Sequence, residues 1–131
     1  MGFLKRLLGL ETIPGEPAPL TDASYDALVP ASDLPCFVYV FTLMCSGCQV
    51  MGGLLNEIGP DYVGRALFFK LDATKNPRTA AAHGVTGVPT VLCIRGGSVA
   101  DRLVGLVPLD DLRGWIDRAL ATGEADGAAS R

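Results

Sequence analysis

The sequence predicts an α/β domain built on a mixed central sheet. Two observations support this prediction. Short apolar runs rich in aromatic and β-branched residues alternate with segments of helical period, and Gly or Pro residues separate them. Runs that are apolar throughout are typical of strands buried on both faces. The chain has 131 residues, of which 49% are hydrophobic, and this suits one packed domain.

The first half of the chain contains one clear strand and one clear helix. Residues 11–19 contain three prolines and should form a linker or a poor edge strand, and a short helix should follow at 23–29. Residues 37–41, Phe-Val-Tyr-Val-Phe, are the first buried strand. From Cys45 the apolar positions adopt helical spacing, and Gly59-Pro60 stops or kinks that helix. These positions are Cys48, Met51, Leu54, Leu55 and Ile58.

The second half predicts a β-α-β-β-α series. Residues 67–71 form a buried strand, and Asn76-Pro77 opens a helix that Gly84 ends. The strands at 91–94 and 99–104 flank the tight turn Gly96-Gly97. A final amphipathic helix has Leu109, Leu112, Trp115, Ile116, Ala119 and Leu120 on one face.

Both ends of the chain are separable from this domain, which we place at residues 13–121. Residues 1–12 should form an amphipathic helix that packs on its own domain, the alternative being a weak interfacial or partner anchor. Residues 122–131 are small and polar and predict a disordered tail. The apolar run at 7–10 is shorter than the roughly 7–15 residues of a secretory signal. No run approaches the ~20 apolar residues of a membrane span, so we expect a cytoplasmic protein.

A pair of cysteines three residues apart, Cys45-Ser46-Gly47-Cys48, begins the first long helix directly after a strand. In this context the C-x-x-C pattern indicates a redox-active dithiol. The exposed N–H groups and the positive dipole end of the helix would stabilise a Cys45 thiolate, which makes Cys45 the nucleophile. Cys48 lies one turn further along, is expected to be more buried, and suits the resolving role. Ser46 and Gly47 would add hydrogen-bond donors near the Cys45 sulfur.

Half of a zinc site and two idle buried thiols are the alternatives for this pair. Zinc requires two further ligands, usually as a second close pair. Only Cys36, Cys93 and His83 remain as candidates, and they are widely scattered. We therefore expect no metal, and we expect Cys36 and Cys93 to be small core residues.

Further segments show that the chain resembles the thioredoxin family. They are residues 20–26, the segment 70–85, the loop Gly87-Val88-Pro89-Thr90, Gly96-Gly97 and Gly105. The resemblance spans about residues 20–120 without gaps. It implies a thioredoxin-like fold, in which helices flank both faces of the mixed sheet.

The resemblance also implies the surface that binds substrates. Pro89 would follow a cis peptide bond and lie beside the cysteines, the backbone of Val88 would pair with substrate, and Gly105 would lie on the same surface. Such a protein reduces protein disulfides without a bound cofactor, and a thioredoxin reductase returns the electrons. We expect a monomer that transports electrons in this way and contributes to cell redox homeostasis.

The chain departs from the family at several positions around the motif. Met44 replaces the usual Trp and would offer a softer docking surface. Ser46-Gly47 replaces Gly-Pro, and Tyr39 replaces a buried Asp. Lys70 is retained without its acidic neighbour, and it is either a lysine that extends to solvent along the strand or a residue with a role beside Tyr39.

Two other functions are compatible with the same motifs. A non-catalytic binding module could use the Val88-Pro89 groove to hold a client. A redox sensor could switch an interaction of the N-terminal helix through its disulfide. Nucleic acid is excluded as a partner, because the net charge is −3 and no basic stripe is present.

Deleting residues 1–11 should leave the fold and the dithiol activity intact, since this segment precedes a proline-rich stretch and has no counterpart in the resemblance. Thermal unfolding and insulin reduction by the truncated protein test this. Loss of the cooperative transition would show that Phe3, Leu4, Leu7 and Leu8 belong to the core.

Overall fold

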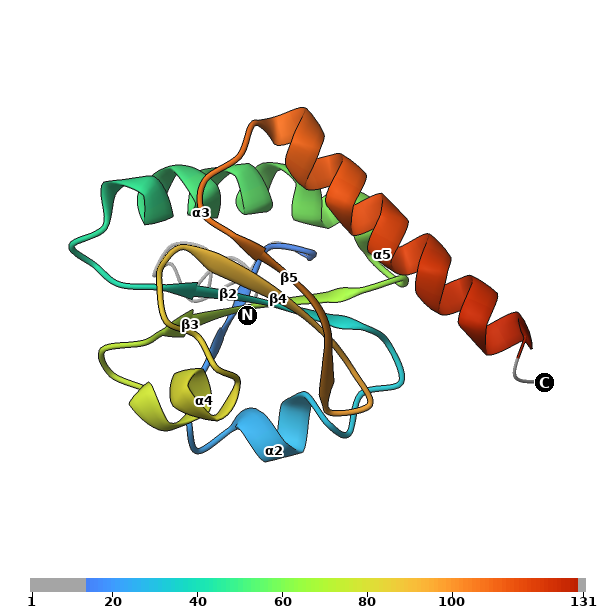
Figure 1. The fold of residues 1–131 in the computed structure, drawn as a ribbon, viewed down its shortest axis with the longest axis horizontal. Helices are drawn as coiled ribbons and strands as arrows, with labels where there is room; N and C mark the ends of the chain where they lie inside the picture. Colours follow the sequence, from blue (N-terminus) through green and yellow to red (C-terminus); the bar gives the residue numbers. More distant parts are fainter. Residues whose placement is uncertain (1–13, 130–131) are drawn as a thin grey trace, which may run out of the picture.

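Five strands form one mixed sheet in the order β1-β3-β2-β4-β5 (Figure 1). The computed structural model describes residues 14–129, so the predicted helix at 1–12 lies outside the described residues. β2 and β1 run parallel to β3, whereas β4 runs antiparallel to both β2 and β5. The strands are β1 Ala18–Leu20, β2 Cys36–Phe41, β3 Leu67–Asp72, β4 Thr90–Arg95 and β5 Ser98–Val104.

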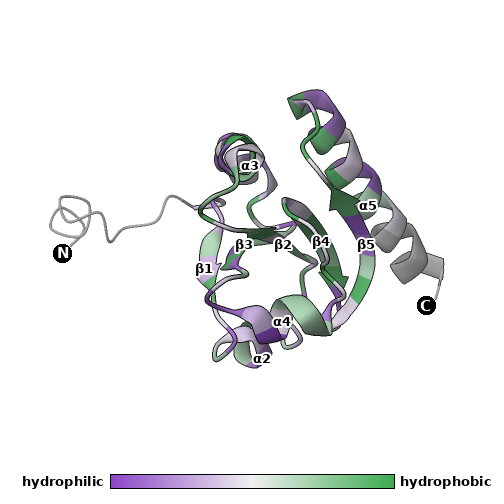
Figure 2. Ribbon diagram, turned by 60° about the vertical axis from the view of Figure 1, so that its left-hand side comes forward, coloured by the Kyte–Doolittle hydropathy of each residue, from purple (hydrophilic) through white to green (hydrophobic). Residues whose placement is uncertain are grey.

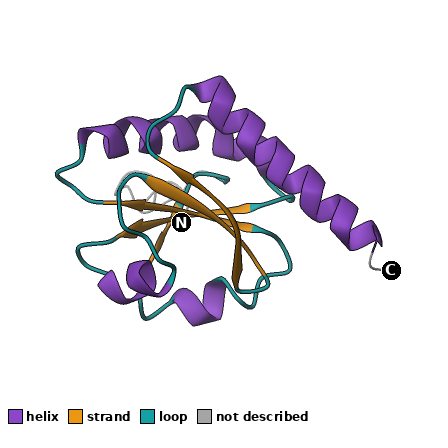
Figure 3. Cartoon of the chain, in the orientation of Figure 1, coloured by secondary structure: helices purple, strands orange, loops and turns teal. Residues whose placement is uncertain are grey.

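Helices cover both faces of this sheet, as the sequence predicted. Figure 1 shows the long helices α3 (Ser46–Ile58) and α5 (Leu109–Ala129) above the strands and the short helices α2 (Tyr25–Leu28) and α4 (Pro77–Ala82) below them. A single 3₁₀ turn, η1 (Gly59–Tyr62), continues α3. Figure 3 separates the helices, strands and loops by colour. This arrangement confirms the predicted α/β fold with a flanked mixed sheet.

The period of two along each strand divides the core into two layers. Phe37, Tyr39 and Cys93 face α3 and α5, where they pack with Met51 and Leu55. The alternate residues of the same strands pack against α2 and α4, and they include Cys36, Val38, Val40, Leu92 and Ile94. Figure 2 shows the hydrophobic stretches of the central strands enclosed between the two helical layers. The first of these layers holds the residues that matter for the redox motif.

The first strand agrees with the structure expected from the sequence, whereas the last helix is longer than expected. The proline-rich stretch contributes β1, a three-residue strand at the sheet edge, which is one of the two structures expected there. At the other end, α5 continues to Ala129, whereas a disordered tail was expected from residue 122. Alanine and glutamate favour helix, and adding residues to an existing helix avoids the cost of nucleation. No helix within residues 14–129 is long and apolar enough to cross a membrane.

The segment before β1 crosses the end of α3 with backbone in contact with backbone. Gly15 has a φ of +93°, and a Cβ atom on it would lie 2.6 Å from the Pro60 nitrogen. A Cβ atom on Gly59 would in turn overlap the Gly15 carbonyl oxygen. Both positions therefore require glycine on steric grounds. Gly53 lies in the middle of α3 on its exposed side, and a Cβ atom there would have no neighbour within 4 Å.

Gly59→Ala should lower the free energy of unfolding by about 1–3 kcal/mol, because the added methyl group forces the crossing segments apart. Gly53→Ala is the matched control and should raise it by roughly 0.5–1 kcal/mol through helix propensity. Denaturant unfolding of both variants measures the difference. Equal effects of the two substitutions would mean that the crossing is not tightly packed.

Candidate active site

The two cysteines of the motif form a disulfide at the point where β2 leads into α3. Cys45 is the N-cap residue of α3, with an extended backbone, and Cys48 lies in the first turn. Their Cα atoms are 5.2 Å apart. The Cys48 backbone N–H donates a hydrogen bond to the Cys45 sulfur over 3.1 Å. The Cys45 sulfur is therefore an acceptor for one of the free N–H groups at the start of the helix.

The two sulfurs also differ in accessibility. Cys45 is partly exposed, whereas only 1% of the Cys48 surface is exposed, and Cys48 packs in the core layer beneath α3. No acidic residue lies in the first turn of α3. A negative charge on Cys45 would thus meet the positive end of the helix dipole without a neighbouring acid in that turn.

The Val88-Pro89 loop lies against this helix start, and its peptide bond is cis. A Cβ atom on Gly47 would be 3.8 Å from Pro89 Cδ, which is ordinary van der Waals contact. The Gly105 N–H donates a hydrogen bond of 2.8 Å to the Pro89 carbonyl oxygen. The structure thereby places the motif, Pro89 and Gly105 next to one another, which is the arrangement that the resemblance implies.

Apolar side chains project around the disulfide. Met44, directly before Cys45, is 96% exposed, and Leu43 is 65% exposed. Val88 is partly buried and contacts the core layers on both faces of the sheet. Leu43 and Met44 therefore offer exposed apolar surface directly before Cys45 in the chain.

Tyr39 lies on the core side of the motif and is hydrogen-bonded to it. Its hydroxyl donates a hydrogen bond to the Cys48 carbonyl oxygen, and its ring stacks on Phe41 with the centroids 5.2 Å apart. A Cβ atom on Gly52 would lie 3.4 Å from this ring, so α3 passes close to it. Burial raises the pKa of Tyr39 from 10.0 to about 12. The residue is therefore a neutral donor at physiological pH.

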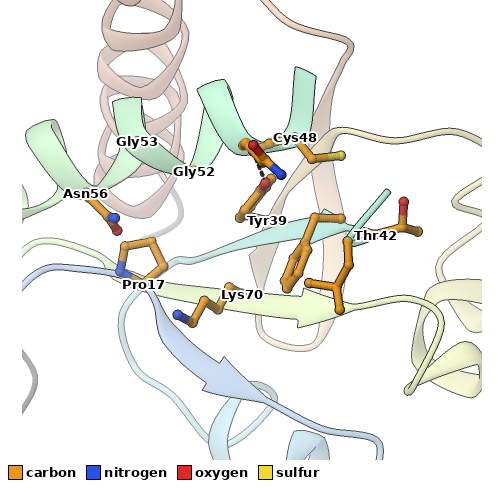
Figure 4. Close-up of a pocket in the computed structure, with 11 residues that line it drawn as sticks. Pro17, Tyr39, Thr42, Cys48, Gly52, Gly53, Asn56 and Lys70 are labelled. Carbon is orange, nitrogen blue, oxygen red and sulfur yellow. Dashed lines mark hydrogen bonds between the residues drawn. The ribbon is translucent and has the colours of Figure 1, made fainter. Parts of the chain in front are cut away.

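A hollow of about 370 Å³ lies beside Tyr39 on the side of β1 and β3 (Figure 4). Cys48, Gly52, Asn56 and Lys70 are among its lining residues. Lys70 is paired with Tyr39 in the β2–β3 register, and it is exposed. The structure thus places Lys70 beside Tyr39 without burying it, so both interpretations of this lysine remain compatible with its position.

Comparison with known proteins identifies the family. The family model described as Thioredoxin matches residues 16–118, most of the chain. The chain belongs to the thioredoxin family. It is 36% identical over 88 residues to Thioredoxin 2 of Chlorobaculum tepidum, covering 67% of this chain and 81% of that protein. It is 32% identical over 101 residues to a thioredoxin of Synechocystis sp., covering 77% and 94% of the two chains.

A third relative is a plant protein. Thioredoxin M4, chloroplastic, of Arabidopsis thaliana is 31% identical over 101 residues, which are 77% of this chain and 52% of that protein. Family membership and the Cys45–Cys48 disulfide together establish a thiol–disulfide oxidoreductase with protein-disulfide reductase activity.

The other two cysteines of the chain are buried and free, as expected for small core residues. Cys36 and Cys93 are both 0% exposed, and burial raises the pKa of each thiol. They lie in different core layers on opposite faces of the sheet. Within residues 14–129, no group of His, Cys, Asp or Glu side chains could hold a metal ion.

Sequence reasoning missed an apolar surface next to the motif. Val50 is 52% exposed and Leu106 is 48% exposed, and Leu54, assigned to the core face of the helix, is only partly buried. A signal was available, because Val50 is apolar but falls outside the core stripe that continues from Cys48 to Met51. Sequence periodicity does not show which distant residues lie next to such a side chain in the fold.

Tyr39→Phe should lower the free energy of unfolding of the oxidised protein by about 1 kcal/mol, because it removes the bond to the Cys48 carbonyl. The pKa of Tyr39 is raised on folding, so its contribution is fully present below pH 10 and is lost as the pH approaches 12. Urea unfolding of both proteins at neutral pH and above pH 10 should show the difference shrinking at high pH. A pH-independent difference would contradict this account of Tyr39.

Proposed function

We propose that Cys45 is the attacking cysteine and Cys48 the resolving cysteine in the reduction of client protein disulfides. The observation that carries this assignment is the asymmetry of the two sulfurs. Cys45 is accessible and accepts a helix N–H, and Cys48 is almost fully buried. The accessible position at the helix end favours the thiolate, which is the reactive form of a cysteine.

The reaction proceeds through a mixed disulfide. In the reduced protein, the Cys45 thiolate attacks one sulfur of the client disulfide, that disulfide breaks, and the departing client thiolate takes up a proton. The Cys48 thiol then loses its proton and attacks the Cys45 sulfur. The mixed disulfide breaks, and the second client thiolate leaves and is protonated. Two electrons have passed to the client, and the protein is left with the Cys45–Cys48 disulfide.

The residues around the motif then have supporting parts. Ser46 and Gly47 supply donors close to the Cys45 sulfur. Val88 offers its backbone to an extended client segment next to Pro89, and Gly105 leaves that surface free of a side chain. Met44 provides an adaptable apolar contact, for which its exposure and its flexible thioether are suited.

The same proposal includes the surroundings in which this chemistry runs. A thioredoxin reductase, a flavoprotein, returns two electrons to the disulfide after each cycle, and the protein itself works without a bound cofactor. We place this monomer in the cytoplasm, where reducing conditions keep Cys36 and Cys93 as free thiols. Its relatives include bacterial thioredoxins, which support this placement.

Cys45→Ser should reduce insulin turnover to the uncatalysed rate, because it removes the attacking sulfur. Cys48→Ser should instead accumulate a mixed disulfide with the client, since the second step has no nucleophile. Non-reducing electrophoresis and mass spectrometry distinguish the two outcomes. Iodoacetamide applied to the reduced wild-type protein should label Cys45 first, and faster labelling of Cys48 would reverse the two roles.

A further inference from the structure

A second apolar hollow lies beside the motif, on the side of α3 that faces α5. It has a volume of about 410 Å³, and its walls come from α3 and from the segment that joins β5 to α5. Figure 1 shows this segment passing across α3 on its way from β5 to α5. The lining residues are Val50, Leu54, Leu106, Val107, Pro108 and Leu109. None of these side chains carries a charge or a hydrogen-bonding group, so the hollow is suited to an apolar occupant.

This hollow is continuous with the surface that receives the client. A Cβ atom on Gly47 would lie 3.8 Å from Pro89 Cδ and 4.0 Å from Leu106 Cβ. Gly47 therefore joins the Val88-Pro89 groove to Leu106, and Leu106 is itself a wall of the hollow. A client chain that lies across Pro89 with its sulfur on Cys45 would extend over Gly47 toward this hollow.

We propose that this hollow binds a large apolar side chain of the client, located about two residues from the client cysteine. Val50 is five residues beyond Cys45 on α3, which is a rise of about 7.5 Å. An extended client chain advances about 3.3 Å per residue, and residues two apart point to the same face. The proposal rests on the function proposed above, and it adds that Leu106 and Val50 select clients by this side chain.

Exposure of the two walls supports a role in binding rather than in folding. Val50 and Leu106 keep about half of their surface accessible, although Val50 directly precedes the fully buried Met51. A leucine or phenylalanine that entered the hollow would remove this apolar surface from water together with its own. A serine at the same client position would bury almost no apolar surface in the hollow.

The test uses short peptides whose single cysteine is joined in a disulfide to thionitrobenzoate, so that attack by Cys45 releases a coloured thiolate. One set places Leu, Phe or Ser two residues before the cysteine, and the other set places them two residues after it. In one of the two sets, kcat/KM, or the second-order rate constant of a single turnover, should be about tenfold higher for the Leu and Phe peptides than for the Ser peptide. No preference in either set would overturn the proposal.

Matched variants locate the preference. Leu106→Ser and Val50→Ser should each reduce the preference to about twofold or less. Val63→Ser is the control, because Val63 is 57% exposed on the loop before β3 and is not a wall of the hollow. A preference that survives both hollow variants, or that is also lost in Val63→Ser, would overturn the proposal. Thermal unfolding verifies that each variant is folded.

Reduction of bis(2-hydroxyethyl) disulfide by the wild-type protein separates this proposal from the proposed function, because that substrate has no side chain to enter the hollow. The reaction is expected whether or not the hollow binds a client side chain, and its absence would instead refute the proposed function. Two other occupants would also overturn the proposal. A wild-type dimer that Leu106→Ser dissociates would indicate a second copy of the chain. A preference that appears only after deletion of residues 1–11 would indicate that this segment fills the hollow.

Discussion

The pairing of β2 with β4 is the interaction on which the redox site depends. Val40 is opposite Thr90 in this antiparallel pair, and Thr90 is in turn opposite Val104 on β5. Pro89 precedes Thr90 and Gly105 follows Val104. Both therefore lie beyond the strand ends on the side of the sheet where β2 ends and leads into the motif. Three segments that are distant in sequence meet there because of strand register, and a shift by one residue would move each strand's side chains to the other face.

Tyr39 gives this site an electrostatic character of its own. The family has a buried carboxylate at this position, and that group would place a negative charge beneath Cys48 when ionised. The Tyr39 hydroxyl donates to the Cys48 carbonyl oxygen and stays neutral, because burial raises its pKa. The exposed Lys70 beside it consequently faces no counter-charge from residue 39. Because the phenol does not ionise in the physiological range, it cannot take up a proton near Cys48 in the way that a carboxylate at this position could.

Most of the fold could be predicted from the sequence, because β2 and most of β3 and β4 are runs of apolar residues and the two long helices have a clear period. The cis peptide bond before Pro89 came from the resemblance of a short loop, and no periodicity would have indicated it. The end of α5 was predicted too early, since small residues such as those after residue 121 are compatible with both helix and coil. The surface around Val50 and Leu106 was missed for a different reason. Apolar spacing identifies a helix face, but what covers that face depends on a segment more than fifty residues away in sequence.

The placement of the two remaining cysteines has a practical consequence. Cys36 and Cys93 lie in separate core layers, each fully enclosed, so neither can reach the other across the sheet or meet a reagent in the folded protein. Cys48 is nearly as well covered. We expect a bulky maleimide dye or spin label to attach to the reduced native protein at Cys45, because Cys45 is the one cysteine that is partly exposed. The wild-type protein, although it has four cysteines, thus offers one accessible labelling position for spectroscopy, and that position lies next to the exposed Met44.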